Sequence, residues 1–186
     1  MSQIILASQS PRRKQLLEWA EVSFQIIVAG TEETFPKNLV PTEVALHIAM
    51  EKAKAVQKKA ADKIIIAADT IVVLNHEIIG KPVDRNDAIT ILNKLSGAHH
   101  TVITGVVILQ NEKTISFTDS TDVEFHSLSR HQIEFYVDNY KPYDKAGAYA
   151  IQEWIGVVGI KRIKGDFYNV MGLPISRVVR ELQNFK

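Results

Sequence analysis

The chain has 186 residues, and 46% of them are hydrophobic, which is enough for a core in one large domain or two small lobes. With 22 basic and 21 acidic residues the formal net charge is +1, which argues against proteins that bind bulk nucleic acid or a membrane surface. The absence of cysteine excludes disulfides, thiolate metal sites and a cysteine nucleophile. Neither a signal-peptide pattern nor an apolar stretch of about 18 residues occurs, so we expect a cytoplasmic protein.

The first predicted elements are a short strand at 4–6 and a helix that begins just after Ser10. Ser10 is a typical N-cap residue, and Pro11 suits the first helical position because its missing N–H costs nothing there. Arg12 and Arg13 follow, although cations at this end oppose the helix dipole. Because helix N-termini and arginine forks both suit phosphate oxygens, the junction predicts an anion site. The alternative is an ordinary capped helix with a solvated basic first turn.

The rest of the chain alternates strand and helix patterns without repeats or an obvious linker. Apolar residues at helical spacing mark the helices, and short β-branched runs mark the strands. This order is typical of an α/β or an α+β fold with a mixed sheet. We expect the α/β class, with the mixed sheet flanked by helices, in a single domain over 1–186 with room for two lobes. Strands are predicted at 22–28, 63–68, 71–74, 77–79, 102–109 and 114–125, with turns at 75–76 and 111, and helices at 41–60, 84–95, 129–139 and 174–185.

Asp69 is a lone carboxylate between two apolar, strand-like runs. A charge in such a place is costly unless it is paired, hydrogen-bonded or bound to a metal ion. A functional Asp69 can hold a divalent cation or take a proton from water. Alternatively, Asp69 only turns the chain between two strands, and spacing alone does not separate the two interpretations.

Other polar residues at the ends of apolar runs have both a functional and a plain interpretation. Lys81 in a Gly-Lys-Pro loop suits phosphate but is also common loop material, and Lys52 fits a solvated helix face. The Gln152 amide suits a base edge or a surface position. The P-loop spacing is absent, and the adjacent His99 and His100 point to opposite sides of a strand, so we expect no zinc site.

Several short blocks occur in an order that covers almost the whole chain. They are Ser8-x-Ser10-Pro11-Arg12-Arg13, Ala68-Asp69-Thr70, Gly80-Lys81-Pro82, Ser96-Gly97, Thr104-Gly105-Val106, Asp144-Lys145-Ala146-Gly147-Ala148-Tyr149, Ile151-Gln152 and Asn169-Val170-x-Gly172-Leu173-Pro174. Together they resemble the Maf family of septum-formation proteins, which are nucleoside triphosphate pyrophosphatases. The resemblance implies an elongated fold like that of the inosine triphosphate pyrophosphatases, with a central nucleotide cleft, and commonly a homodimer.

The resemblance also implies roles for individual residues. Asp69 would be the proton acceptor and the main ligand of a divalent cation of the Mg²⁺ or Mn²⁺ class, and Glu33 would be a second ligand of that cation. Water would attack the α-phosphorus, which releases the monophosphate and pyrophosphate. The side chains expected to hold the phosphates are Ser8, Ser10, Arg12, Arg13, Lys52 and Lys81.

Three further positions point to one branch of the family. Arg12, Thr70 and Gln152 match the residues of the members that prefer dTTP and UTP, whereas the branch acting on 7-methylated GTP replaces them. The family often has Tyr-Gly-Ile-Gln-Gly where this chain has Ala150 and Glu153, and we expect Glu153 to face solvent. Two alternatives stay open: a preference for modified nucleotides, and a nucleotide-sensing inhibitor of cell division.

Overall fold

The computed structural model describes residues 3–185, and within them it forms a mixed seven-stranded sheet with flanking helices. The predicted α/β class is therefore confirmed. The elements in chain order are β1 (Ile4–Leu6), α1 (Pro11–Trp19), β2 (Phe24–Ile26), α2 (Pro41–Gln57), β3 (Ile64–Leu74), β4 (Glu77–Ile79), α3 (Arg85–Leu95), β5 (His99–Gln110), β6 (Lys113–Phe125), α4 (Arg130–Tyr140), the 3₁₀ turn η1 (Ala146–Ala148), α5 (Trp154–Gly159), β7 (Ile160–Lys164), α6 (Phe167–Met171), α7 (Ile175–Leu182) and the 3₁₀ turn η2 (Gln183–Phe185).

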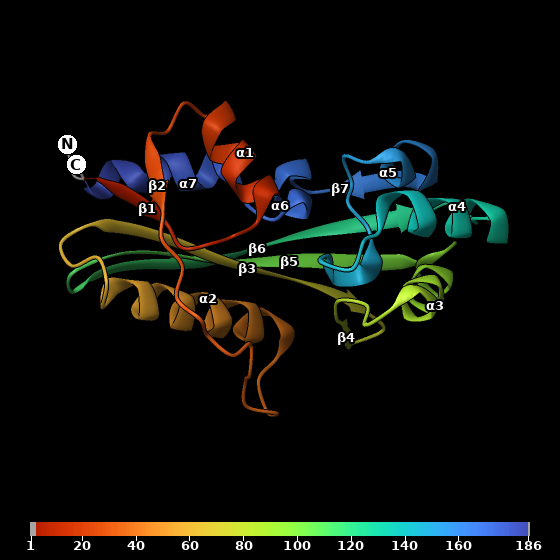
Figure 1. The fold of residues 1–186 in the computed structure, drawn as a ribbon, viewed down its shortest axis with the longest axis horizontal. Helices are drawn as coiled ribbons and strands as arrows, with labels where there is room; N and C mark the ends of the chain where they lie inside the picture. The colour runs from red at the N-terminus through yellow and green to blue at the C-terminus, as the bar shows by residue number, and fades with distance from the viewer. Residues whose placement is uncertain (1–2, 186) are drawn as a thin grey trace. The chain divides into compact units, whose positions relative to one another are not determined.

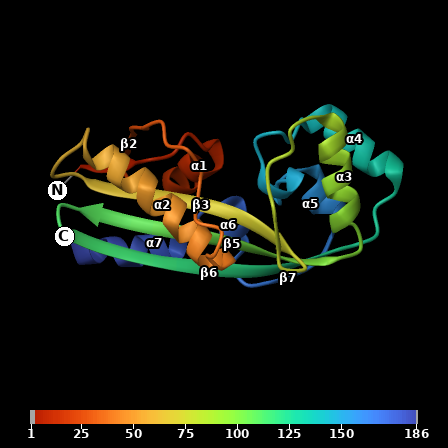
Figure 2. The same cartoon turned by 90° about the horizontal axis from the view of Figure 1, so that it is seen from below.

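The described chain divides into two compact units. The first unit comprises residues 3–70, 104–119 and 172–185, and the second comprises 71–103 and 120–171. In the first unit the strand order is β2-β1-β3-β5-β6, and β1 runs parallel to both β2 and β3. Helix α2 lies on one face of these strands, and α1 and α7 lie on the other (Figures 1 and 2).

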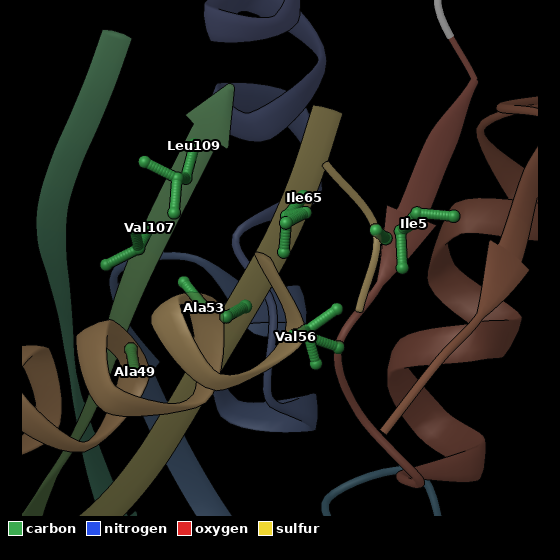
Figure 3. Packing of buried hydrophobic residues seen from close by; sticks show 10 residues of the cluster. Ile5, Ala49, Ala53, Val56, Ile65, Val107 and Leu109 are labelled. Carbon is green, nitrogen blue, oxygen red and sulfur yellow. The ribbon is translucent and has the colours of Figure 1, made fainter. Parts of the chain in front are cut away.

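The core of the first unit forms where α2 packs on the strands. Ala49, Ala53 and Val56 of α2 are buried against Ile65 of β3 and Val107 of β5 (Figure 3). Ala49 and Ala53 are small, so the helix can approach the strands closely. The buried positions of α2 follow the predicted 3.6-residue spacing.

Gly105 of β5 lies directly against the backbone of α2. A Cβ atom at this position would lie 2.5 Å from the Ala45 carbonyl carbon and 2.6 Å from the Leu46 nitrogen. Such distances leave no room for any side chain, since the obstacle is helix backbone. The glycine of the Thr104-Gly105-Val106 block is thus required by packing.

In the second unit the strand order is β4-β3-β5-β6-β7, with α3 packed beside α4 (Figure 2). Strands β3 and β4 are antiparallel, and the predicted turn between them is confirmed at Asn75 and His76, whose φ angles are 50° and 70°. His99 and His100 point to opposite sides of β5, as predicted: the side chain of His99 is 73% exposed, whereas His100 is buried.

Two sequence predictions differ from the structure. The strands predicted at 63–68 and 71–74 are one continuous strand, β3, because Asp69 lies inside it and does not turn the chain. The segment 143–173 forms four short elements, η1, α5, β7 and α6, that the sequence analysis did not predict. No helix formed by residues 3–185 combines the length and apolar character that a membrane crossing needs.

Candidate functional site

The turn between β1 and α1 is built as the sequence predicts. Helix α1 begins at Pro11, and the Ser10 hydroxyl accepts a hydrogen bond from the Arg13 N–H at 3.5 Å. The Ser10 N–H in turn donates to the buried Ser8 hydroxyl at 3.2 Å. Both serine hydroxyls are therefore part of the cap that orders the start of the helix.

Arg13 is buried, and its guanidinium group joins three segments of the first unit. Its Nε donates to the Gly172 carbonyl oxygen at 2.8 Å, Nη1 donates to Ser8 Oγ at 3.1 Å, and Nη2 donates to Thr70 Oγ1 at 2.9 Å. Thr70 Oγ1 also lies 3.0 Å from Thr104 Oγ1. Since each Nη carries a second N–H, the guanidinium keeps donors for an anion while it holds these segments together.

The pKa of Arg13 is affected by its burial and by neighbouring charges. Burial lowers the pKa of the guanidinium, while the carboxylates of Asp69 and Glu33 oppose this effect and Arg12 adds to it. An arginine stays protonated at neutral pH under such conditions. Arg13 therefore supplies a permanent positive charge within electrostatic range of Asp69.

Asp69 is held by a lysine rather than left alone in its apolar strand. The Lys52 Nζ, on α2, lies 2.7 Å from Asp69 Oδ1 and 2.8 Å from Glu33 Oε1. The Asp69 side chain is 11% exposed and that of Lys52 is 16% exposed, whereas Glu33 lies on an exposed loop. This pairing explains how β3 tolerates a carboxylate, and it excludes the interpretation of Asp69 as a turn residue.

The same carboxylates are the oxygen donors that Mg²⁺ and Mn²⁺ prefer. Among the described residues no group of three or more His, Cys, Asp or Glu side chains gathers as a metal site. Mg²⁺ commonly takes only one or two carboxylates and completes its shell with water and substrate phosphates. Asp69 and Glu33, which already share one cation in Lys52, fit such a site.

A family model described as Maf-like protein matches residues 3–185 of this chain.

The chain belongs to the Maf family.

Relatives that cover nearly the whole chain agree with this assignment. A dTTP/UTP pyrophosphatase of Cytophaga hutchinsonii is 53% identical over 180 residues, which are 97% of this chain and 83% of the relative. A protein of the same name from Bacillus cereus is 46% identical over 185 residues, covering 100% of this chain and 96% of the relative. A HAM1 protein from Coxiella burnetii, 14% identical, shares the fold with a TM-score of 0.55 and covers 99% of this chain and 100% of its own.

The structure brings most of the residues predicted for the phosphate end of this Maf protein into the first unit. Asp69, Lys52 and Glu33 are in direct contact. The Arg13 group forms a second set through hydrogen bonds, and the half-buried Arg12 precedes it on the first turn of α1. The members of the second set are Ser8, Ser10, Arg13, Thr70 and Thr104, of which the sequence analysis did not single out Thr104 as a site residue.

Lys81 and Gln152 belong to the second unit, where both are exposed. The loop of Lys81 is fixed to the η1 turn because the Gly147 N–H donates to the Gly80 carbonyl oxygen at 3.1 Å. Gln152 is on the turn between Ala150 and α5. An exposed position suits a side chain that must contact a ligand, and the predicted roles of both residues remain predictions.

Glu153 does not face solvent, so that expectation is wrong. Its side chain is 23% exposed, and its carboxylate accepts a hydrogen bond from the hydroxyl of the buried Tyr136. Its other oxygen lies 3.6 Å from the Nζ of Lys145, which is itself buried. The sequence analysis missed this arrangement because nothing in the spacing of Tyr136, Lys145 and Glu153 predicts that a tyrosine on one helix meets a carboxylate at the start of another.

Proposed function

We propose that this Maf protein is a nucleoside triphosphate pyrophosphatase that hydrolyses dTTP and UTP to the monophosphate and pyrophosphate. Relatives at 44–53% identity over nearly the full chain bear the name dTTP/UTP pyrophosphatase. The observation in the structure that carries the proposal is the buried Asp69 carboxylate held 2.7 Å from Lys52, beside the Arg13 network. Together these residues supply a general base and positive charge in one place.

In the proposed reaction Asp69 accepts a proton from the attacking water. The water oxygen forms a bond to the α-phosphorus, and the bond from the α-phosphorus to the bridging oxygen of the leaving pyrophosphate breaks. The ammonium group of Lys52 and the guanidinium of Arg13 offset the negative charge of the phosphates. Positioning and charge stabilisation of this kind account for most of the catalysis of phosphoryl transfer.

A divalent cation of the Mg²⁺ or Mn²⁺ class is part of this proposal. Asp69 and Glu33 would hold it, and it would neutralise charge on the phosphate oxygens when bound. The support is the convergence of both carboxylates on one ammonium group, that of Lys52. Lys52 would then be free to contact a phosphate, which is its expected role in the family.

Selection of the substrate's nucleobase is assigned to Arg12, Thr70 and Gln152, which this chain shares with the dTTP/UTP branch. Thr70 is fixed by Arg13 Nη2 at 2.9 Å, so its hydroxyl has a set position. Lys81 and the hydroxyls of Ser8 and Ser10 complete the proposed phosphate contacts. A homodimer is proposed on the family resemblance alone.

A pyrophosphate-release assay tests the function directly. Purified protein is incubated with dTTP, UTP, CTP, 5-methyl-UTP or 7-methyl-GTP, each with Mg²⁺, with Mn²⁺ and with a chelator. We expect the highest kcat/KM with dTTP and UTP, and activity only with a divalent cation. Release of pyrophosphate from none of these nucleotides would contradict the proposal, and a clear preference for 5-methyl-UTP would favour a function in removing modified nucleotides.

A further inference from the structure

The turn that carries Gln152 is held at both ends by one buried side chain, Tyr136 of α4. The Tyr136 hydroxyl accepts a hydrogen bond from the Ala150 N–H at 3.2 Å and donates one to Glu153 Oε2. Tyr136 is 0% exposed, so the contact is shielded from water. Gln152 is the exposed residue between the two anchored ends, which fixes the backbone from which its amide extends.

The carboxylate of Glu153 is stabilised on its second oxygen as well. Its Oε1 lies 3.6 Å from the Nζ of Lys145, which also contacts Asp144 Oδ1 at 2.8 Å. A largely buried charge needs partners of this kind.

Helix α5 closes the same turn from its other side. A Cβ atom at Gly156 would lie 1.7 Å from the Ile151 carbonyl oxygen, and the Gly156 N–H donates to the Glu153 carbonyl oxygen at 2.9 Å. The ring of Trp154 packs on Phe135 of α4 with centroids 4.8 Å apart. Backbone contact, ring packing and the Tyr136 hydroxyl therefore all restrict residues 150–154.

Fixing this turn matters because a carboxamide can present either face. Its oxygen accepts and its nitrogen donates, so a freely rotating amide can satisfy the N3–H and O4 of uracil or thymine and, turned over, the N3 and N4–H₂ of cytosine. Discrimination between these bases requires that the wrong base meet an unpaired donor or acceptor. A fixed backbone narrows the positions that the amide can take before the base arrives, and it favours one of the two pairings.

We propose that Tyr136 and Glu153 are positioning residues that fix the backbone at Gln152 and so direct its amide toward a thymine or uracil edge. The inference rests on the proposed function, since it concerns the selection of the base in that reaction. Neither residue contacts the nucleotide: both act through the backbone of the turn. Lys145 supports them by balancing the charge of Glu153.

The test compares kcat and KM for dTTP, UTP and CTP in three variants. Tyr136→Phe removes one hydroxyl and keeps the ring, and Glu153→Gln removes the charge and keeps the length. We expect both to lower the ratio of kcat/KM for dTTP to that for CTP by roughly 10-fold, mainly through a higher KM for dTTP, since misplaced contacts cost this much or more. The control is Asp138→Asn. Asp138 is on α4, as Tyr136 is, and the variant removes the charge from its exposed ion pair with Arg85 of α3, which should leave the ratio unchanged.

Amide hydrogen exchange separates positioning from loss of folding. In Tyr136→Phe and Glu153→Gln the amides of 151–153 should exchange faster, while those of β3 and β5 keep wild-type protection. If the first variant does not fold, Glu153→Gln, at a partly exposed position, still decides the question. An active enzyme whose selectivity is unchanged in both variants would overturn this inference alone, whereas a wild-type protein inactive on dTTP and UTP would overturn the proposed function as well.

Discussion

The Lys52–Asp69 cluster and the turn around Gln152 are both polar and largely buried, yet they are built from different interactions. In the first, opposite charges meet directly, at 2.7 Å between Lys52 and Asp69 and 2.8 Å between Lys52 and Glu33. In the second, the Tyr136 hydroxyl and the backbone of α5 hold the turn, and its one ion pair, between Glu153 and Lys145, is longer, at 3.6 Å. A cluster of closely paired charges suits proton transfer and phosphate binding, whereas a tightly packed, hydrogen-bonded support suits recognition by shape and hydrogen bonding.

The largest effect should follow from removal of the base. Asp69→Asn keeps the size of the side chain but not its charge, so turnover should fall by about 1,000-fold or more for every nucleotide, since a general base contributes roughly 100-fold to 10,000-fold. Nucleotide binding, followed by calorimetry, should remain measurable. Near-wild-type turnover in this variant would show that Asp69 is not the general base. The contrast between a catalytic cluster and a recognition turn would then fail.

The two adjacent arginines should differ in what they support. Arg13→Ala leaves Ser8, Thr70 and the Gly172 carbonyl without their buried partner, which costs about 3 kcal/mol of unfolding free energy and lowers kcat for all nucleotides alike. Arg12→Ala should change the preference among dTTP, UTP and CTP with little loss of stability. Denaturant unfolding and kinetics with the three nucleotides give both values, and equal, substrate-independent losses in the two variants would contradict the assignment.

In the second unit, His100 provides a prediction on pH. His100 Nε2 lies 2.7 Å from the Tyr149 hydroxyl, and the ring stacks on Phe125. Burial, with a smaller effect of His99, lowers the pKa of His100 to about 4. Because the unfolded chain binds this proton near pH 6.5, its contribution to stability is full above pH 6.5 and is lost as pH falls toward 4.

The expected loss is up to about 3 kcal/mol, at roughly 1.4 kcal/mol for each pH unit. Denaturant unfolding of wild type and of His100→Gln at pH 7, 5.5 and 4.5 measures it. The difference between the two proteins should change with pH in this range, since the other titrating groups are common to both. Parallel pH profiles would show that folding does not keep His100 neutral in this pH range.

The smallest effect should come from the surface of the second unit. Arg85 and Asp138 form an ion pair at 2.5 Å in which both side chains are about half exposed. Hydrogen bonding to Arg85 lowers the pKa of Asp138, but solvent and salt screen such pairs. Arg85→Met should therefore leave the thermal midpoint and the kinetics almost unchanged, and a large loss of either would mean that the packing of α3 on α4 depends on this pair.

The sequence was sufficient for the elements that obey simple spacing rules. The cap at Ser10, the start of α1 at Pro11 and the turn at Asn75 and His76 depend on local preferences, and the structure has all of them. Asp69 is different: its charge argued for a turn as strongly as for a buried site. Only tertiary contact with Lys52, 17 residues away in the chain, lets it continue a strand.

The segment 143–173 shows where the sequence was insufficient. Its elements are too short for hydrophobic periodicity to be detected. They contact other parts of the second unit instead: η1 packs on α3, β7 pairs with β6, and Asn169 of α6 donates to the Val102 carbonyl oxygen. Glu153 was expected in solvent because a glutamate usually is, and its contact with Tyr136 joins residues on separate helices. Likewise, Arg13 was predicted as a phosphate-binding residue, and its hydrogen bonds to Thr70 and Gly172 depend on the fold.

The central claim is that water attacks the α-phosphorus of the nucleotide, and isotope labelling tests it most directly. Wild-type protein is given dTTP in ¹⁸O-water, and the two products are analysed by mass spectrometry. Attack of water at the α-phosphorus predicts that the label enters dTMP and that pyrophosphate is unlabelled. Label found in pyrophosphate and absent from dTMP would contradict the proposed chemistry at Asp69.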